Sequence, residues 1–166
     1  MENRRSQDNR RPMAPKPKAE FKEKTIDLRR VTRVVAGGKR MSFRATVILG
    51  DEKGRVGLGL GKGLDVSQAI DKAKVNAKKN LVTINLRGRT IPHETFAKYS
   101  AATVIIKPAK LGHGLKAGGS ARNVLLMVGI KDATAKILGT TKNKLTNAMA
   151  TIDALKQLKP AITKRK

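Results

Sequence analysis

The chain is organised around the stretch GGKRMSFRATVILGDEKGRVGLGLGKG, which runs from Gly37 to Gly63. Apolar residues occupy every second position of its first half, which is the period of a strand with one buried face. These residues are Met41, Phe43, Ala45, Val47 and Leu49, and the intervening positions hold Ser42, Arg44 and Thr46. Asp51 to Gly54 is typical of a short hairpin connection with a glycine at its end. The stretch therefore predicts an antiparallel hairpin with one apolar face and one face that is basic or bare backbone.

The second strand of this hairpin has a glycine at every other position. Val56, Leu58 and Leu60 alternate with Gly57, Gly59 and Gly61. Glycines in a sheet indicate close packing or strong twist. Bare backbone would also let an RNA phosphate chain approach the neighbouring cations, and both explanations stay open at this point. The stretch does not match a nucleotide-binding P-loop, because Gly63 stands where that motif requires Ser or Thr.

The residues around this stretch complete a small domain. A strand is expected from Ile26 to Val35, and Gly37-Gly38 reverses the chain beside the cations Lys39 and Arg40. Asp65 with Gln68 is a good helix start, followed by apolar residues at helical spacing. That apolar stripe consists of Val66, Ala69, Ile70, Ala73, Ala77 and Leu81. The order strand, strand, strand, helix predicts a three-stranded antiparallel sheet plus a helix.

The second half of the chain predicts another small α/β unit. We expect strands at 81–86, 91–99 and 101–107, a glycine-rich basic loop at 110–119, a helix after Ser120, a short helix or turn at 132–138, and a last helix opened by Thr141 or Asn143. The fold class is therefore α+β with two small domains, at 25–86 and 87–158. Residues 1–24 and 159–166 are expected to be basic tails, the first disordered alone and ordered on RNA.

The charge balance points to a polyanionic partner. Lys and Arg number 37 against 12 Asp and Glu, a formal net charge of +25. Such an excess repels itself and is relieved by nucleic acid or, as a second choice, by an anionic membrane. No apolar run reaches the ~20 residues of a membrane span, and the N-terminus lacks an apolar signal core. We therefore expect a cytoplasmic protein, or one in an organelle lumen if a transit segment was removed.

Catalysis and metal binding have little support. The chain has no cysteine, and His93 and His113 lack carboxylates or thiols at ligand spacing. Acidic residues are too few and scattered for a convincing acid–base pair. We therefore expect neither an enzyme nor a cofactor.

RNA is favoured over duplex DNA. No predicted helix shows a base-reading Arg/Asn/Gln cluster, whereas hairpin tips and glycine-rich loops suit folded RNA. An aromatic content of only 2% argues against a stacking platform for single strands. The expected RNA contacts are Arg33, Lys39, Arg40, Arg44, Arg55 and Lys62 in the first domain, and Lys110, Lys116 and Arg122 in the second.

Several motifs in order resemble the ribosomal protein S-five family of the bacterial small subunit. They are Gly37-Gly38-Lys39-Arg40-Met41-Ser42-Phe43-Arg44-Ala45, the Gly-Arg-Val-Gly-x-Gly-x-Gly-Lys of 54–62, Lys116-Ala117-Gly118-Gly119-x-x-Arg122-x-Val124-Leu125, and Asp132-x-x-Ala135-Lys136-x-x-Gly139-Thr140. The resemblance implies a first domain like the double-stranded-RNA-binding fold. It implies a second domain with a β-α-β unit of left-handed crossover, against the usual chirality.

The resemblance also implies a role. Members of this family are structural constituents of the small subunit that bind its rRNA and support assembly and translational accuracy. They lie near the channel through which mRNA enters, beside proteins S-four and S-eight. Val31, Thr32 and Arg33 match the hairpin near the spectinomycin site, and Gly114 and Arg122 match positions where substitutions alter decoding accuracy.

Two other functions remain as alternatives. The chain could be a free, non-ribosomal RNA chaperone or duplex-RNA-binding protein, which would not stay with small subunits in high salt. A nucleotide-dependent enzyme is the third hypothesis, weakened by the failed loop motifs.

Overall fold

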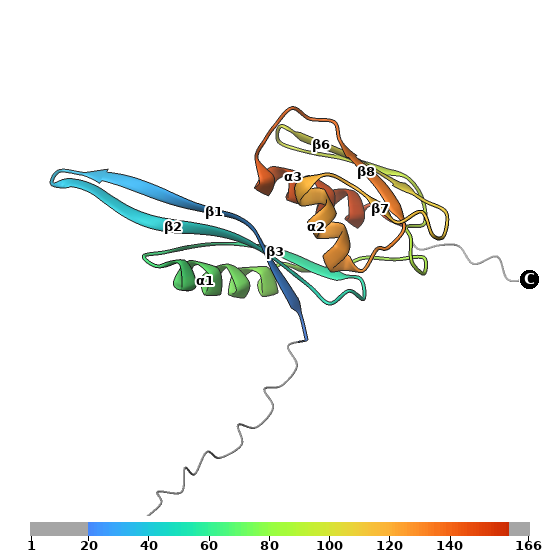
Figure 1. Cartoon of the computed structure of the whole chain (residues 1–166), viewed down its shortest axis with the longest axis horizontal. Helices are drawn as coiled ribbons and strands as arrows, with labels where there is room; N and C mark the ends of the chain where they lie inside the picture. Colours follow the sequence, from blue (N-terminus) through green and yellow to red (C-terminus); the bar gives the residue numbers. More distant parts are fainter. Residues whose placement is uncertain (1–19, 160–166) are drawn as a thin grey trace, which may run out of the picture.

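The computed structural model describes residues 20–159 and shows two domains side by side (Figure 1). The tails predicted at 1–24 and 159–166 therefore lie almost entirely outside the described residues. Only Glu20 to Lys24 and Lys159 of those segments are seen, and Lys22 to Lys24 already belong to the first strand. Each domain contains a four-stranded sheet, which confirms the predicted α+β class.

The first domain follows the predicted order of strands and helix. Its strands are β1 (Lys22–Val35), β2 (Gly38–Gly50), β3 (Arg55–Gly63) and β4 (Leu81–Thr83), with α1 (Val66–Lys79) between the last two. All pairings are antiparallel, in the order β1-β2-β3-β4. The short β4 adds a fourth strand to the expected three, and it ends at Thr83 rather than residue 86.

The glycines of β3 serve the packing of α1. The register pairs Val47 with Gly59 and Ala45 with Gly61. On this face of the sheet, side chains of β2 therefore lie beside glycines of β3. A Cβ on Gly59 would overlap the carbonyl oxygen of Ala73, and one on Gly61 would overlap that of Ala69. The close-packing explanation is therefore confirmed. The idea that this bare backbone lies open to a phosphate chain is wrong, because α1 covers it.

The other face of the first sheet is divided between packing and charge. Ile48, Val56 and Leu58 point away from α1 and are buried in a core shared with the second domain, where Val124 and Leu125 lie. The prediction of a single apolar face is therefore wrong, because the register pairs Leu58 with Ile48 on the face that α1 does not cover. The predicted basic face exists only on the outer half of the sheet, beyond the second domain.

The second domain has a mixed sheet. Its elements are β5 (Thr95–Tyr99), β6 (Ala102–Pro108), β7 (Leu115–Lys116), α2 (Gly119–Val128), β8 (Ala133–Ile137) and α3 (Lys144–Lys156). The sheet order is β5-β6-β8-β7, and β7 pairs with β8 in parallel, so β7-α2-β8 is a β-α-β unit. Both helices contact the two sheets and lie between them (Figure 1).

Some second-domain predictions are displaced or wrong. Residues 132–138 do not form a helix or turn, because Ala133, Ala135 and Ile137 alternate with polar residues and complete the sheet as β8. β5 begins at Thr95 rather than Ile91, and the basic loop contains the short β7. The cap of α2 is Gly118 rather than Ser120, whereas α3 begins after Asn143 as predicted.

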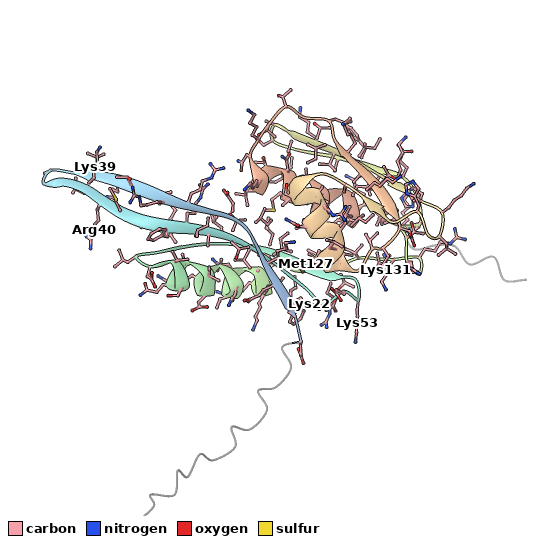
Figure 2. The ribbon with its side chains drawn as sticks, viewed as in Figure 1. Lys22, Lys39, Arg40, Lys53, Met127 and Lys131 are labelled. Carbon is pink, nitrogen blue, oxygen red and sulfur yellow. The ribbon has the colours of Figure 1, made fainter. Side chains whose placement is uncertain are left out.

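The turn between β2 and β3 joins the domains through backbone contacts. The amide of Glu52 donates to the carbonyl of Met127 at 3.1 Å, and that of Gly54 to Val128 at 2.9 Å. Figure 2 shows Met127 where the end of α2 meets the first domain. A Cβ on Gly50 or Gly129 would overlap backbone atoms of the opposite domain. The two domains therefore share both a core and a tightly fitted backbone junction.

Candidate nucleic-acid interface

The hairpin of β1 and β2 extends beyond α1 and beyond the second domain (Figure 1). Residues 32–41 at its end are all exposed. Figure 2 shows Lys39 and Arg40 at the tip, pointing to opposite sides of the ribbon. This agrees with the alternation of a strand, in which neighbouring side chains leave by opposite faces.

Cations gather on one face of this hairpin, the face to which Ile48 belongs farther along β2. Arg33 pairs with Arg40, and Arg44 lies between Arg29 on β1 and Lys62 on β3. Directly paired residues share a face, and adjacent strands lie about 4.8 Å apart. The two rows are four residues apart along β1, which is about 13 Å. We call Arg29, Arg33, Arg40, Arg44 and Lys62 the hairpin basic face.

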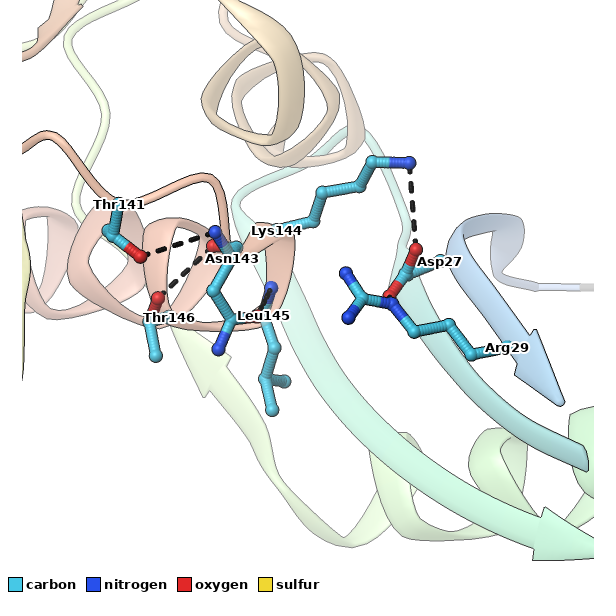
Figure 3. A network of polar contacts seen from close by, with 7 residues as sticks. All are labelled: Asp27, Arg29, Thr141, Asn143, Lys144, Leu145 and Thr146. Carbon is cyan, nitrogen blue, oxygen red and sulfur yellow. Dashed lines mark hydrogen bonds and ion pairs between the residues drawn. The ribbon is translucent and has the colours of Figure 1, made fainter. Parts of the chain in front are cut away.

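Asp27 marks the inner end of the hairpin basic face. Its carboxylate lies 2.7 Å from Nε of Arg29 and 3.6 Å from Nζ of Lys144 at the start of α3 (Figure 3). In α3 the cap residue Asn143 accepts a hydrogen bond from the amide of Leu145 at 3.1 Å. Asp27 therefore links the base of the hairpin to the second domain. The paired positions 29–33 and 40–44 contribute no carboxylate to the hairpin basic face.

Arg55 does not join this group. It lies at the opposite end of β3, where its Nε is 2.6 Å from the Asp51 carboxylate and its guanidinium is 5.0 Å from the centre of the Phe21 ring. Partial burial acts to raise the pKa of Asp51, but hydrogen bonds from Arg55 and Lys53 hold it below the ordinary value of 3.8. These contacts order the turn that joins the two domains.

The second-domain candidates lie around the loop that leads into α2. Lys110 and Lys116 are exposed. Arg122 donates from Nη1 to the carbonyl of Leu115 at 2.7 Å, and the amide of Gly114 donates to Oδ1 of Asp132 at 2.9 Å. Gly114 has a φ of +75°, which favours glycine. Gly114 and Arg122 therefore shape the loop, whatever else they contact.

Sequence reasoning missed three residues that build these sites. Arg29 belongs to the hairpin basic face, and its place four residues before Arg33 on a strand could have revealed it. Asp132 is buried, and Nε of Arg89 lies 3.4 Å from its Oδ2. The backbone amides of Lys131 and Asp132 both donate to the carbonyl of Arg89. No signal in the sequence pairs Arg89 with Asp132, because they come from distant segments.

The structure thus separates the predicted contacts into distinct groups. The hairpin basic face collects Arg33, Arg40, Arg44 and Lys62, with Lys39 on the opposite side of the tip. Lys110, Lys116 and Arg122 surround a loop of the other domain, and Arg55 stands apart. Within residues 20–159 no cluster of His, Asp or Glu could hold a metal ion, and none of the helices there is long and apolar enough to cross a membrane.

Comparison with known proteins decides the family. Residues 21–85 match the family described as "Ribosomal protein S5, N-terminal domain", and residues 97–164 match "Ribosomal protein S5, C-terminal domain". The chain belongs to the ribosomal protein S5 family. The S5 matches cover both domains of the fold, so the family resemblance of the motifs is confirmed.

Individual members of the S5 family are similar over most of the chain. A protein of Dehalococcoides mccartyi (strain CBDB1) named "Small ribosomal subunit protein uS5" is 49% identical over 150 residues, covering 89% of this chain and 87% of its own. A protein of Thermotoga neapolitana with the same name is 47% identical over 139 residues, covering 84% and 78%.

Proposed function

We propose that the chain is a structural constituent of the small ribosomal subunit, which binds rRNA through the hairpin basic face. Membership of the S5 family supports the ribosomal role. The observation that carries the RNA contact is the register itself. It brings Arg33 beside Arg40, and Arg29 beside Arg44 and Lys62, on an exposed projection. Arginine is well suited to phosphate, because its fork of donors can bind two oxygens at once.

The hairpin basic face suits recognition of backbone and shape. The only aromatic ring in β1 or β2 is that of Phe43, which is half-buried beside α1. Base stacking therefore contributes little here, and contacts to phosphate and ribose carry the affinity. The second-domain group of Lys110, Lys116 and Arg122 supplies a separate contact on the far side of the molecule.

The finer parts of the role rest on the family resemblance. We place the chain in the cytoplasm, in the small subunit, near the channel where mRNA enters and beside proteins S-four and S-eight. Val31, Thr32 and Arg33 would form the hairpin near the spectinomycin site. Gly114 and Arg122 would influence accuracy by shaping the loop that meets a neighbouring protein. The role is structural, without catalysis or a cofactor.

Gradient fractionation tests this function. A lysate in high salt is separated on sucrose, and fractions are probed for this chain. We expect it with small subunits at about one copy each. Recovery in the light fractions would reject the ribosomal role and favour the alternative of a free RNA chaperone or duplex-RNA-binding protein.

A further inference from the structure

Strand β3 of the first sheet runs beyond its outer neighbour. β4 pairs only with Arg55 to Gly57, whereas β3 continues to Gly63. Within residues 20–159, no strand pairs with the outer edge of β3 from Leu58 to Gly63. The backbone N–H and C=O groups along such an edge can bond to a strand of another chain, which is a common route to aggregation.

Two asparagines of α1 occupy the place of the missing strand. The side-chain amide of Asn76 donates to the carbonyl of Leu60 at 2.7 Å, and that of Asn80 donates to the carbonyl of Leu58 at 3.4 Å. The spacing fits, because four residues of a helix rise about 6 Å and two residues of a strand advance about 6.7 Å. The helix therefore presents amide donors at nearly the repeat of the strand's carbonyls.

These side-chain bonds continue the row of bonds that the next segment of chain begins. The carbonyl of Gly54 accepts from the amide of Ile84 at 2.8 Å, and Val56 pairs with β4. Carbonyls that leave a strand by the same edge are two residues apart, so Leu58 and Leu60 belong to this row. Backbone amides serve the first half of the row, and asparagine amides serve the second.

The stretch of β3 that the asparagines cover lacks the charges that protect the other edge of the sheet. The opposite edge strand is β1, which carries Arg29, Arg30 and Arg33. Residues 58–61 contain no charged side chain. A cavity of about 400 Å³ also opens beside this stretch, lined by residues of β3 and α1. Charged side chains are a usual protection of edge strands, so this stretch needs a different one.

We propose that Asn76 and Asn80 close the open edge of β3 against strand pairing and so keep the free chain monomeric. The partner that they exclude is the β1 edge of a second copy. The hairpin of β1 and β2 extends beyond α1, so it brings no helix of its own toward the α1 of another copy (Figure 1). Such a contact joins two different surfaces, and further copies would add to an open chain. The inference is independent of the proposed function.

Sedimentation of the purified full chain tests the proposal. Asn76→Ala removes the donor of the shorter bond and preserves the helix, because Ala has the higher helix propensity. The matched control is Gln68→Ala, which removes an exposed amide from the first turn of the same helix. The proteins are compared at about 0.5 M salt, where screening weakens the repulsion between copies. Circular dichroism establishes that each variant is folded.

We expect the parent and Gln68→Ala to sediment as single chains at every concentration. Asn76→Ala should give a mean mass that rises with concentration to about twice that of one chain or more, because an added strand can then bond to the edge. Asn80→Ala, which leaves the shorter bond in place, is the second variant and should associate less strongly. A folded Asn76→Ala that stays monomeric would overturn the inference, as would equal association of the parent or of Gln68→Ala.

Hydrogen exchange read by mass spectrometry shows where the copies meet. In the associated Asn76→Ala protein, amides within 58–62 and 28–34 should exchange about tenfold more slowly than in a dilute monomeric sample of the same variant, because both edges would then be bonded. Association with unchanged exchange in these two segments would mean that another surface joins the copies, and the inference would be wrong.

Discussion

Gly59 illustrates how one residue can decide where a helix lies. It stands on β3 opposite Val47, and its α-hydrogen side faces Ala73 of α1. Any side chain there would push the helix away from the sheet, because the overlapping atoms belong to backbone. Gly37, in the turn at the hairpin tip, has no atoms within 4 Å of the position of a Cβ. The same residue type therefore has opposite tolerance at the two positions.

Gly59→Ala should destabilise the first domain by about 3 kcal/mol, since a rigid backbone contact must be relieved by moving α1. Urea unfolding followed by circular dichroism measures this change. Gly37→Ala is the matched control and should stay within about 0.5 kcal/mol of the parent. Equal midpoints for the two variants would show that α1 does not rest directly on β3.

Asp51, at the junction of the domains, makes a pH-dependent contribution to the stability of the folded protein. Its side chain is 5% exposed and accepts hydrogen bonds from the backbone amides of Lys53 and Arg55, at 2.8 and 2.9 Å. A carboxyl whose pKa is lowered by folding stabilises the protein fully above its unfolded pKa. That contribution is lost as the pH falls through the folded pKa, which lies below 3.8.

Asp51→Asn should therefore lower the free energy of unfolding by about 1 kcal/mol at pH 7. The effect is this small because Arg55 is half-exposed and solvent screens its charge. The difference from the parent should shrink as the pH falls from about 5 to below about 3.5. Urea unfolding at a series of pH values tests it. A difference that stays constant across this range would mean that the Asp51 charge contributes nothing.

The hairpin of β1 and β2 is the element whose sequence serves contact rather than packing. Near the second domain its β2 residues are buried on both faces, as Val47 and Ile48 show. Toward the tip the alternation continues, but arginines replace the apolar residues. The register places these arginines side by side across the two strands, so positive charge recurs along one face of the hairpin.

Arg33→Ala together with Arg40→Ala should weaken binding to small-subunit rRNA. It should also reduce the slope of log K against log salt by about two units, one for each phosphate that is no longer neutralised. Titrations at several salt concentrations measure both quantities. Lys72→Ala together with Lys79→Ala, on exposed positions of α1, is the control with an equal decrease in charge. The same weakening in both variants would indicate that only net charge matters.

At the scale of the whole molecule, the two domains share one hydrophobic core. Ile48 from β2 lies in the same core as Val128 of α2 and Leu155 of α3. A hydrogen bond between the backbones of Glu52 and Met127 also joins the two domains.

Ile48→Ala should destabilise both domains together by about 3 kcal/mol, through the cavity that it leaves in the shared core. Hydrogen exchange read by mass spectrometry would follow amides of β2 and of α3 in denaturant. Val47→Ala, which opens the separate core under α1, is the comparison and should weaken the first domain more than the second. Protection in α3 that survives the Ile48 change unaltered would show two independent domains.

Local patterns of the amino-acid sequence determine much of this protein by themselves. Alternation predicts β1, β2 and β3, helical spacing predicts α1 and α3, and charge with spaced motifs predicts an RNA-binding member of the S5 family. These signals lie within short stretches of chain, where geometry follows directly from residue order.

The tertiary structure alone decides what depends on distant segments. It shows that α1 covers the β3 glycines, that Val56 and Leu58 face the second domain, that 133–137 is a strand, and that Arg29 joins Arg44 and Lys62. Those outcomes require packing partners tens of residues away, and a single strand's pattern does not name the surface that will bury each of its faces.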